Sequence, residues 1–174
     1  MHRQLFSVFK KMKLEISLAF IVFVIGAFLG ALMGMGQDEV TFVDNTASAT
    51  AILQNNLKAC VIIFSGFVLL GIPTFISLLF NGLILGSTLK ASSFYLSGAE
   101  LLQRGAPHAI LEIPGIVLAG AVGFQTVRIL INIIRNKKVS LKEELMTASV
   151  AIIAAVICIS LAALVEGFIT VKFI

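Results

Sequence analysis

The sequence predicts an all-α, polytopic membrane protein with about five transmembrane helical segments. Of its 174 residues, 59% are hydrophobic and 13% are charged, and the mean hydropathy is +1.06. An average soluble domain is about 45–50% apolar and about 25% charged. A soluble helical domain of this length could not bury so much apolar surface, whereas the core of a bilayer is itself apolar. Four long apolar regions supply the spans, at about 14–36, 57–95, 107–130 and 145–171.

The first apolar region follows the basic leader MHRQLFSVFKKMK and is expected to be retained as a helix. Its apolar run, from about Leu14 to Met35, is longer than the roughly 7–15 residues of a signal-peptide core. A small-x-small cleavage pattern at 47–49 lies too far downstream of that run to serve it. We therefore expect a transmembrane helix over 14–36.

The second apolar region, 57–95, is too long for one span. As a straight helix it would measure about 58 Å, against a bilayer core of about 30 Å. Gly71 and Pro73 near its middle favour a break. The prediction is two segments, 57–71 and 74–95. The alternative is a re-entrant hairpin whose turn is shielded from lipid by protein.

The distribution of charge predicts the orientation. The leader is rich in Lys and Arg, residues 37–56 carry three acidic residues and no Lys or Arg, and residues 131–142 are basic. Because cytoplasmic loops carry the excess of Lys and Arg, the leader and 131–142 are expected inside and 37–56 outside. Segments 57–71, 74–95 and 107–130 supply the three crossings needed between the outer and the inner loop. With the first and last segments this gives five spans, a cytoplasmic N-terminus and an outside C-terminus.

The whole chain, 1–174, is therefore expected to be a single integral membrane helical domain of the cell membrane, crossing it several times. Its segments are predicted at about 14–36, 57–71, 74–95, 107–130 and 145–171. The net charge of +4 lies at segment ends, where cations anchor and orient a membrane protein, so no nucleic-acid partner is predicted. Membrane lipids are the expected partners of Lys137, Lys138 and Lys142. Cys60 and Cys158 lie in apolar runs without a metal-binding spacing, and no cofactor is predicted.

The stretch APHAILEIPG, residues 106–115, predicts a polar pocket near the outer membrane boundary. Pro107 suits the first position of a helix that follows a loop. His108 and Glu112 are then one turn apart on the same face. Pro114 lacks an N–H, so the carbonyl of Ile110 loses its helical partner. An imidazole, a carboxylate and a free carbonyl are thus expected within about one turn.

Other ionisable residues are expected at the same level: Lys90, Arg104 and Glu166. Glu112 has Lys90 or Arg104 as its candidate ion-pair partner. His108, Glu112 and Glu166 are in principle metal ligands, but H-E-x-x-H is absent and no metal site or catalytic residue is predicted. A proton relay and metal catalysis are the alternatives to a hydrogen-bonded strut that holds the segments together.

Asn81 lies within an apolar segment and needs a hydrogen-bond partner there. The leading interpretation is a hydrogen bond to another helix, and the alternative is a place in a pore or binding pocket. Gly82 and Gly86 beside it have the small-xxx-small spacing that allows close helix packing. A second row with this spacing consists of Gly115, Ala119 and Gly123.

Glu15 is one turn from Lys11 at the inner end of the first segment, and the two are predicted to form an interfacial ion pair. Otherwise the ionisable residues inside the predicted spans are expected in the outer half of the membrane.

The chain resembles the stage II sporulation protein M family of membrane proteins. The resemblance rests on FNGLILG at 80–86, on PHAILEIPGIVLAGAVGF at 107–124 and on the order of the apolar segments, and it covers most of the chain. The family usually has glycine after the histidine, where this sequence has Ala109. The residues that match by position are Asn81, Gly82, Gly86, Pro107, His108, Glu112, Pro114 and Gly120.

The resemblance implies a multi-spanning protein that acts in engulfment during sporulation or in bacteriocin export and self-protection. The leading hypothesis is accordingly a non-enzymatic scaffold or accessory subunit for cell-envelope remodelling or for peptide export and immunity. The implied partners are other membrane or envelope proteins, such as an ABC-type ATPase on a separate chain or a cell-wall hydrolase, and a homo-oligomer stays open. The second hypothesis is a transporter or channel subunit for an ion or a hydrophobic peptide, with Glu112 and Glu166 as titrating sites.

Overall fold

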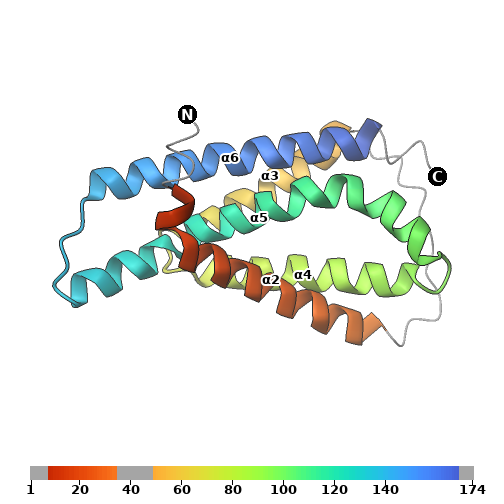
Figure 1. Ribbon diagram of the computed structural model, residues 1–174, viewed down its shortest axis with the longest axis horizontal. Coiled ribbons are helices and arrows are strands. Elements are labelled where there is room, and N and C mark those ends of the chain that lie inside the picture. The colour runs from red at the N-terminus through yellow and green to blue at the C-terminus, as the bar shows by residue number, and fades with distance from the viewer. Residues whose placement is uncertain (1–7, 35–48, 169–174) are drawn as a thin grey trace.

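The computed structural model describes residues 8–34 and 49–168 (Figure 1). This part of the chain is helical throughout apart from short connections, as the sequence predicts. The helices are α2 (Lys13–Met33), α3 (Ala49–Ser65), α4 (Ile72–Ser92), α5 (Gly98–Ile134) and α6 (Leu141–Phe168). Consecutive helices run in opposite directions along the long axis of the molecule (Figure 1).

Four of these helices are long and apolar enough to cross a membrane. They are α2, α4, the Gly105–Ile134 part of α5, and the Leu141–Glu166 part of α6. The chain is thus a multi-pass membrane protein, but the predicted fifth span is not among them. The helix in its place, α3, has 17 residues, or about 26 Å at about 1.5 Å per residue. Its first half contains three consecutive polar residues, Gln54, Asn55 and Asn56.

The predicted break near Gly71 and Pro73 is confirmed. Residues 66–71 form turns between α3 and α4, and Pro73 lies in the first turn of α4. Leu70 and Gly71 have φ angles of 51° and 79°, in the left-handed region that favours glycine. A Cβ at position 71 would also lie 2.8 Å from the ring of Phe124, so glycine is required there on both grounds.

The turn lies at one end of the bundle, beside the start of α2 (Figure 1). The hydroxyl of Thr126 on α5 donates a hydrogen bond to the carbonyl of Phe67, which holds the turn against α5. Val68, Leu69 and Leu70 are 78%, 55% and 52% exposed. The re-entrant alternative requires that protein encloses the turn, and the described part of the chain does not enclose it.

Helix α5 begins at Gly98, nine residues before the predicted start at Pro107. The reason is a capping box that the sequence interpretation overlooked. The backbone N–H of Glu100 donates to Ser97 Oγ (3.3 Å), and that of Ser97 donates to Glu100 Oε2 (2.8 Å). Pro107 consequently lies inside a helix, and α5 bends in its first half, where both of its prolines lie (Figure 1).

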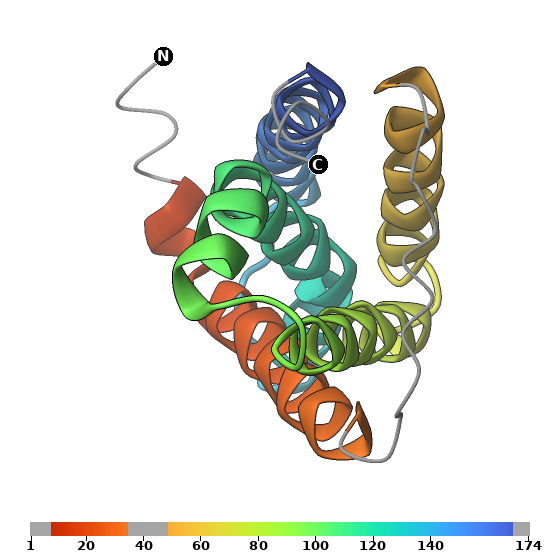
Figure 2. The same cartoon turned by 90° about the vertical axis from the view of Figure 1, so that its right-hand side faces the viewer.

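Helix α5 is the central element of the fold. Seen along the bundle, it lies between α2 and α4 on one side and α3 and α6 on the other (Figure 2). Every residue from 115 to 125 is buried. The glycines of this stretch allow the close packing, since Gly115 faces α6, Gly120 faces α2 and α4, and Gly123 faces α3 and α4. The spacing alone suggested that the row with Gly115 and Gly123 packs against one other helix. In the structure the row contacts several helices.

The most extensive helix pair, α2 with α4, is joined by glycines from both sides. A Cβ at Gly82 would overlap the backbone of α2 near Gly26, and one at Gly86 would overlap the carbonyl of Ala27. Conversely, Gly26 and Gly30 of α2 lie directly against the backbone of α4. Gly82 and Gly86 therefore lie where the two helix backbones are in contact. Gly26 and Gly30 on α2 are likewise four residues apart.

Candidate functional site

Polar side chains gather at the two ends of the bundle. We call the end at which α3 and α5 begin and α6 finishes the pocket end, and the opposite end the ion-pair end. At the pocket end, α3, α5 and α6 line a partly open pocket of about 340 Å³. Its lining residues are Ala51, Ile52, Asn55, Asn56, His108, Glu112 and Glu166. Three residues predicted to share a pocket, His108, Glu112 and Glu166, thus line the same one.

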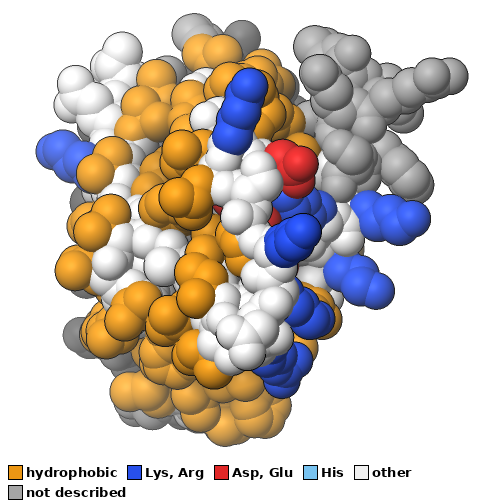
Figure 3. All heavy atoms as spheres, turned by 90° about the vertical axis from the view of Figure 1, so that its left-hand side faces the viewer, with side chains coloured by type: hydrophobic (Ala, Val, Ile, Leu, Met, Phe, Trp, Pro, Cys, Tyr) orange, Lys and Arg blue, Asp and Glu red, His pale blue; other side chains and the backbone are white. Residues whose placement is uncertain are grey.

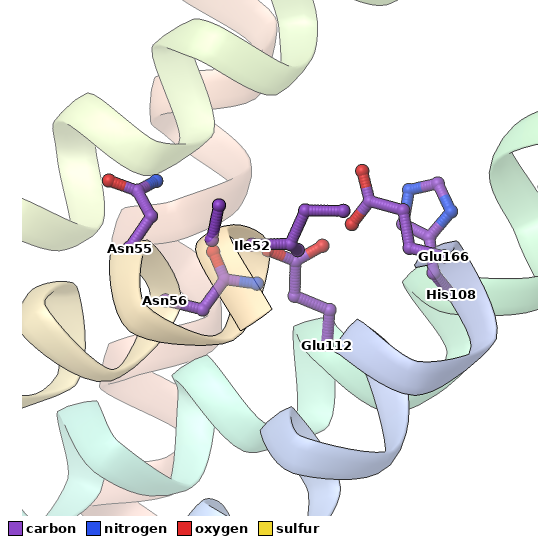
Figure 4. A pocket seen from close by; sticks show the side chains of 7 residues that line it. Ile52, Asn55, Asn56, His108, Glu112 and Glu166 are labelled. Carbon is purple, nitrogen blue, oxygen red and sulfur yellow. The ribbon is translucent and has the colours of Figure 1, made fainter. Parts of the chain in front are cut away.

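The pocket side chains converge from three helices (Figure 4). Glu112 lies between the two asparagines of α3 on one side and Glu166 with His108 on the other (Figure 4). The Nδ1 atom of His108 is fully buried and has no hydrogen-bond partner in the described part of the chain. Pro114 is exposed and does not line the pocket, so its role is limited to the course of α5.

Asn55 and Asn56 belong to the pocket, although the sequence interpretation placed them in a loop. Helix α3 begins at Ala49, eight residues before the predicted start. The two asparagines are therefore part of the helix and not of the predicted outer loop. Two adjacent amides that directly precede an apolar run were the available signal. A helix whose polar face lines a pocket tolerates them without loss of helical structure.

Two polar residues that the sequence singled out, Asn81 and Lys90, do not line the pocket. Asn81 donates a hydrogen bond of 2.7 Å to the carbonyl of Ser77, one turn back in its own helix, where a bond to another helix was expected. Lys90 lies with Nζ 4.8 Å from the ring centre of Phe94, and no ion pair joins it to Glu112 in the described part of the chain. Both belong to α4, whose main partner is α2 and which does not line the pocket. The side chain of Arg104, the other predicted partner of Glu112, lies outside the described part.

The ion-pair end carries a buried network that the sequence interpretation missed. Arg128 of α5 contacts Glu144 of α6 through Nη2 to Oε2 (2.7 Å) and Nη1 to Oε1 (3.2 Å), a two-point contact. Its Nε also donates to Glu15 of α2. Gln125, one turn earlier, donates to Glu144 Oε2 (2.7 Å) and to the Glu144 carbonyl (2.9 Å). We call Lys11, Glu15, Gln125, Arg128 and Glu144 the ion-pair cluster.

The predicted ion pair between Lys11 and Glu15 is not found. Lys11 Nζ lies 3.2 Å from Glu144 Oε1 and 3.7 Å from Glu143 Oε2, while Glu15 pairs with Arg128. Contacts between helices therefore replace the local pair one turn apart. The expectation that ionisable groups inside the spans lie in the outer half is also wrong, since this cluster occupies the opposite end from the pocket.

The ion-pair end also presents exposed cations. Lys and Arg side chains form a band across this face (Figure 3). Exposed cations in the α5–α6 connection and the first turn of α6 are Arg135, Lys137, Lys138 and Lys142. This arrangement is what a membrane–water boundary with anionic headgroups favours.

An apolar core separates the two polar ends. Between Glu112 and Gln125, all residues of α5 from 115 to 124 are buried and none is ionisable. They pack with buried apolar residues of the other four helices, such as Phe23, Ile63, Leu78 and Ile159. At about 1.5 Å per residue, this stretch accounts for about 15 Å of packed hydrocarbon along the bundle axis.

Comparison with known proteins supports the family that the motifs suggest. The family model for stage II sporulation protein M matches residues 19–171. The uncharacterized protein MJ0793 of Methanocaldococcus jannaschii is 26% identical over 171 residues, which covers 92% of this chain and 96% of that protein. A second protein of that organism, the uncharacterized protein MJ0706, is 31% identical over 134 residues, or 74% of this chain and 58% of that protein.

No solved structure matches the chain significantly. The family match covers four complete helices, and it includes both the glycine contact between α2 and α4 and the whole of α5. The chain therefore belongs to the stage II sporulation protein M family.

Proposed function

We propose that the protein is a non-enzymatic scaffold or accessory subunit of the cell membrane, which binds a partner protein at its pocket end. It would serve cell-envelope remodelling or the export of a peptide and the associated immunity. The observation that carries the proposal is the pocket itself: a space of about 340 Å³ at the end of the bundle, bounded by polar groups from three helices.

The position of the pocket suits contact with another protein at the membrane surface. Asn55 and Ala51 of α3 are exposed at its edge, so a partner reaches it from the end of the bundle. The cations of the α5–α6 connection favour the cytoplasm for the ion-pair end, which would direct the pocket end outward. An outward position suits an envelope partner such as a cell-wall hydrolase.

The packing of the middle of the bundle argues against the alternative of a transporter that acts alone. A route for ions through the chain would have to pass the buried apolar stretch 115–124. Charged groups are costly in such surroundings unless they are paired. The ionisable groups of the pocket and of the ion-pair cluster therefore do not form a continuous polar path in the described bundle.

The experiment places a photo-crosslinking amino acid at Ala51, at the edge of the pocket, in protein expressed in native membranes. The matched control carries it at Leu89, which is 45% exposed near the same end of the bundle on α4, away from the pocket. We expect a crosslinked adduct with an identifiable membrane or envelope protein from position 51 and not from position 89. The combined variant Glu112→Gln and Glu166→Gln, which keeps the shape of the pocket, should abolish that adduct.

Two results would overturn the proposal. One is equal crosslinking from both positions, which would indicate nonspecific contact. The other is an ion flux across vesicles that contain the purified protein alone and that is lost in Glu112→Gln, because it would establish transport.

A further inference from the structure

We propose that the pocket binds the cationic end of a Lys or Arg side chain that its partner protein supplies. This inference rests on the proposed function and names the chemistry of the partner. It starts from the balance of hydrogen-bonding groups in the pocket, continues with its charge and ends with its size.

The pocket presents an excess of hydrogen-bond acceptors. Glu112 and Glu166 supply two carboxylates, and Asn55 and Asn56 supply two amide oxygens. The buried Nδ1 of His108, which has no partner among the described residues, accepts a hydrogen bond when the imidazole is neutral. The donors among the lining side chains are the two amides and the second nitrogen of the imidazole. A ligand rich in donors complements this set, and ammonium and guanidinium groups carry three and five N–H donors.

The acidic side chains of the pocket also favour a cationic ligand. Two carboxylates face a shared space beside the membrane, and the described residues that line it include no Lys or Arg. Carboxylates at such a boundary are retained at lower cost when a positive charge compensates them. A zwitterionic lipid headgroup fits less well, because its phosphate would approach the same carboxylates.

The geometry favours an organic cation over a metal ion. His108, Glu112 and Glu166 are all within the described part of the chain, and they are not arranged as a group that could hold a metal. The space of about 340 Å³ is in the range of pockets that receive small organic groups. The end of a Lys or Arg side chain would fill such a space while its stem lies against Ile52.

The test uses the purified full chain in detergent and two analogues of these side chains, n-butylammonium chloride and n-butylguanidinium chloride. The thermal midpoint is measured against their concentration at constant ionic strength, with butanol and sodium chloride as controls. A ligand that binds only the folded state raises the midpoint in proportion to RT ln(1 + [L]/Kd). We expect a rise of several degrees with either analogue that grows with the logarithm of its concentration above Kd, and none with butanol or sodium chloride.

Variants assign the effect to the pocket. The rise should disappear in the double variant Glu112→Gln and Glu166→Gln, and persist in Glu143→Gln, which removes a carboxylate that is 74% exposed at the ion-pair end. The inference is overturned if the double variant responds as the unmodified protein does. It is also overturned if only magnesium, calcium or zinc chloride gives a rise that depends on both carboxylates, or if only vesicles of phosphatidylethanolamine do.

Failure of this inference is distinguishable from failure of the proposed function. If the analogues have no effect while crosslinking from position 51 persists, a partner binds through other chemistry and only the inference falls. If the analogues bind while no adduct forms, the pocket takes small cations and the scaffold proposal falls.

Discussion

Arg128 holds two carboxylates that are almost fully buried, so its replacement by methionine should strongly destabilise the fold. The side chains of Glu15 and Glu144 are 4% and 7% exposed, and that of Arg128 is 19% exposed. Removing one partner of a buried ion pair costs about 3–5 kcal/mol, because the remaining charge is left uncompensated. We take the lower value, about 3 kcal/mol, because Lys11 still lies near Glu144 and Arg128 reaches solvent. For a chain of this length, about 2–4 °C per kcal/mol then gives a fall in the thermal midpoint of about 6–12 °C.

The assay follows the reaction of a thiol-reactive dye during heating in detergent. The chain has no tryptophan and one tyrosine, which makes intrinsic fluorescence a weak probe, whereas Cys60 is 1% exposed and reacts only when the fold opens. Replacing Cys158, which is less deeply buried, by alanine in every sample leaves a single reporter. The control is Arg135→Met at the exposed end of the same helix, which should change the midpoint by no more than about 2 °C.

A rescue experiment separates lost charge compensation from lost packing. Adding Glu15→Gln and Glu144→Gln to Arg128→Met removes the uncompensated charges, so more than half of the lost stability should return. The reasoning is refuted if Arg128→Met melts like the control variant, or if neutralising both carboxylates restores nothing.

Two further predictions concern the helices themselves. Gly86→Val should prevent the close packing of α2 on α4, because its Cβ would overlap the carbonyl of Ala27, and the fraction of monodisperse protein on size-exclusion chromatography should fall sharply. Gly98→Ala is its control, since a Cβ there meets no atom within 4 Å; a similar loss in both variants would contradict the packing argument. Ser97→Ala removes the hydroxyl that accepts from the Glu100 N–H and should cost about 1 kcal/mol, measured as a fall of about 2–4 °C in the thermal midpoint. An unchanged midpoint would show that α5 does not depend on this cap.

The helical class, the multi-pass character and the break between α3 and α4 were predictable because each depends on local sequence. Apolar length predicts a helix that crosses a membrane, and a glycine followed by a proline two residues later predicts a break. The start of α5 was also predictable, since Ser97 and Glu100 have the spacing of a capping box. It was missed because Pro107 offered a plausible start nearer to the apolar run.

The ion-pair cluster could be predicted only in part. Gln125 and Arg128 are one turn apart in an apolar segment, and polar groups in such a place require partners. The identity of those partners depends on how three helices are rotated and shifted against one another, which the sequence of each helix does not specify. For the same reason Glu15 was assigned to Lys11, the cation one turn earlier in its own helix, although its partner in space belongs to α5.

The segment 107–124, on which the family resemblance rests, combines two physical tasks within one helix. Its first turns place His108 and Glu112 in the lining of the pocket, where side chains do not fill a space of about 340 Å³. Its later turns replace bulk with glycine and alanine, so that four other helices can pack around α5. Substitutions in the first part should therefore change binding while leaving the fold intact, and substitutions in the second part should change the fold. A motif with this division is expected where a rigid central helix presents a binding site at its end, because the packed part fixes the position of the polar part.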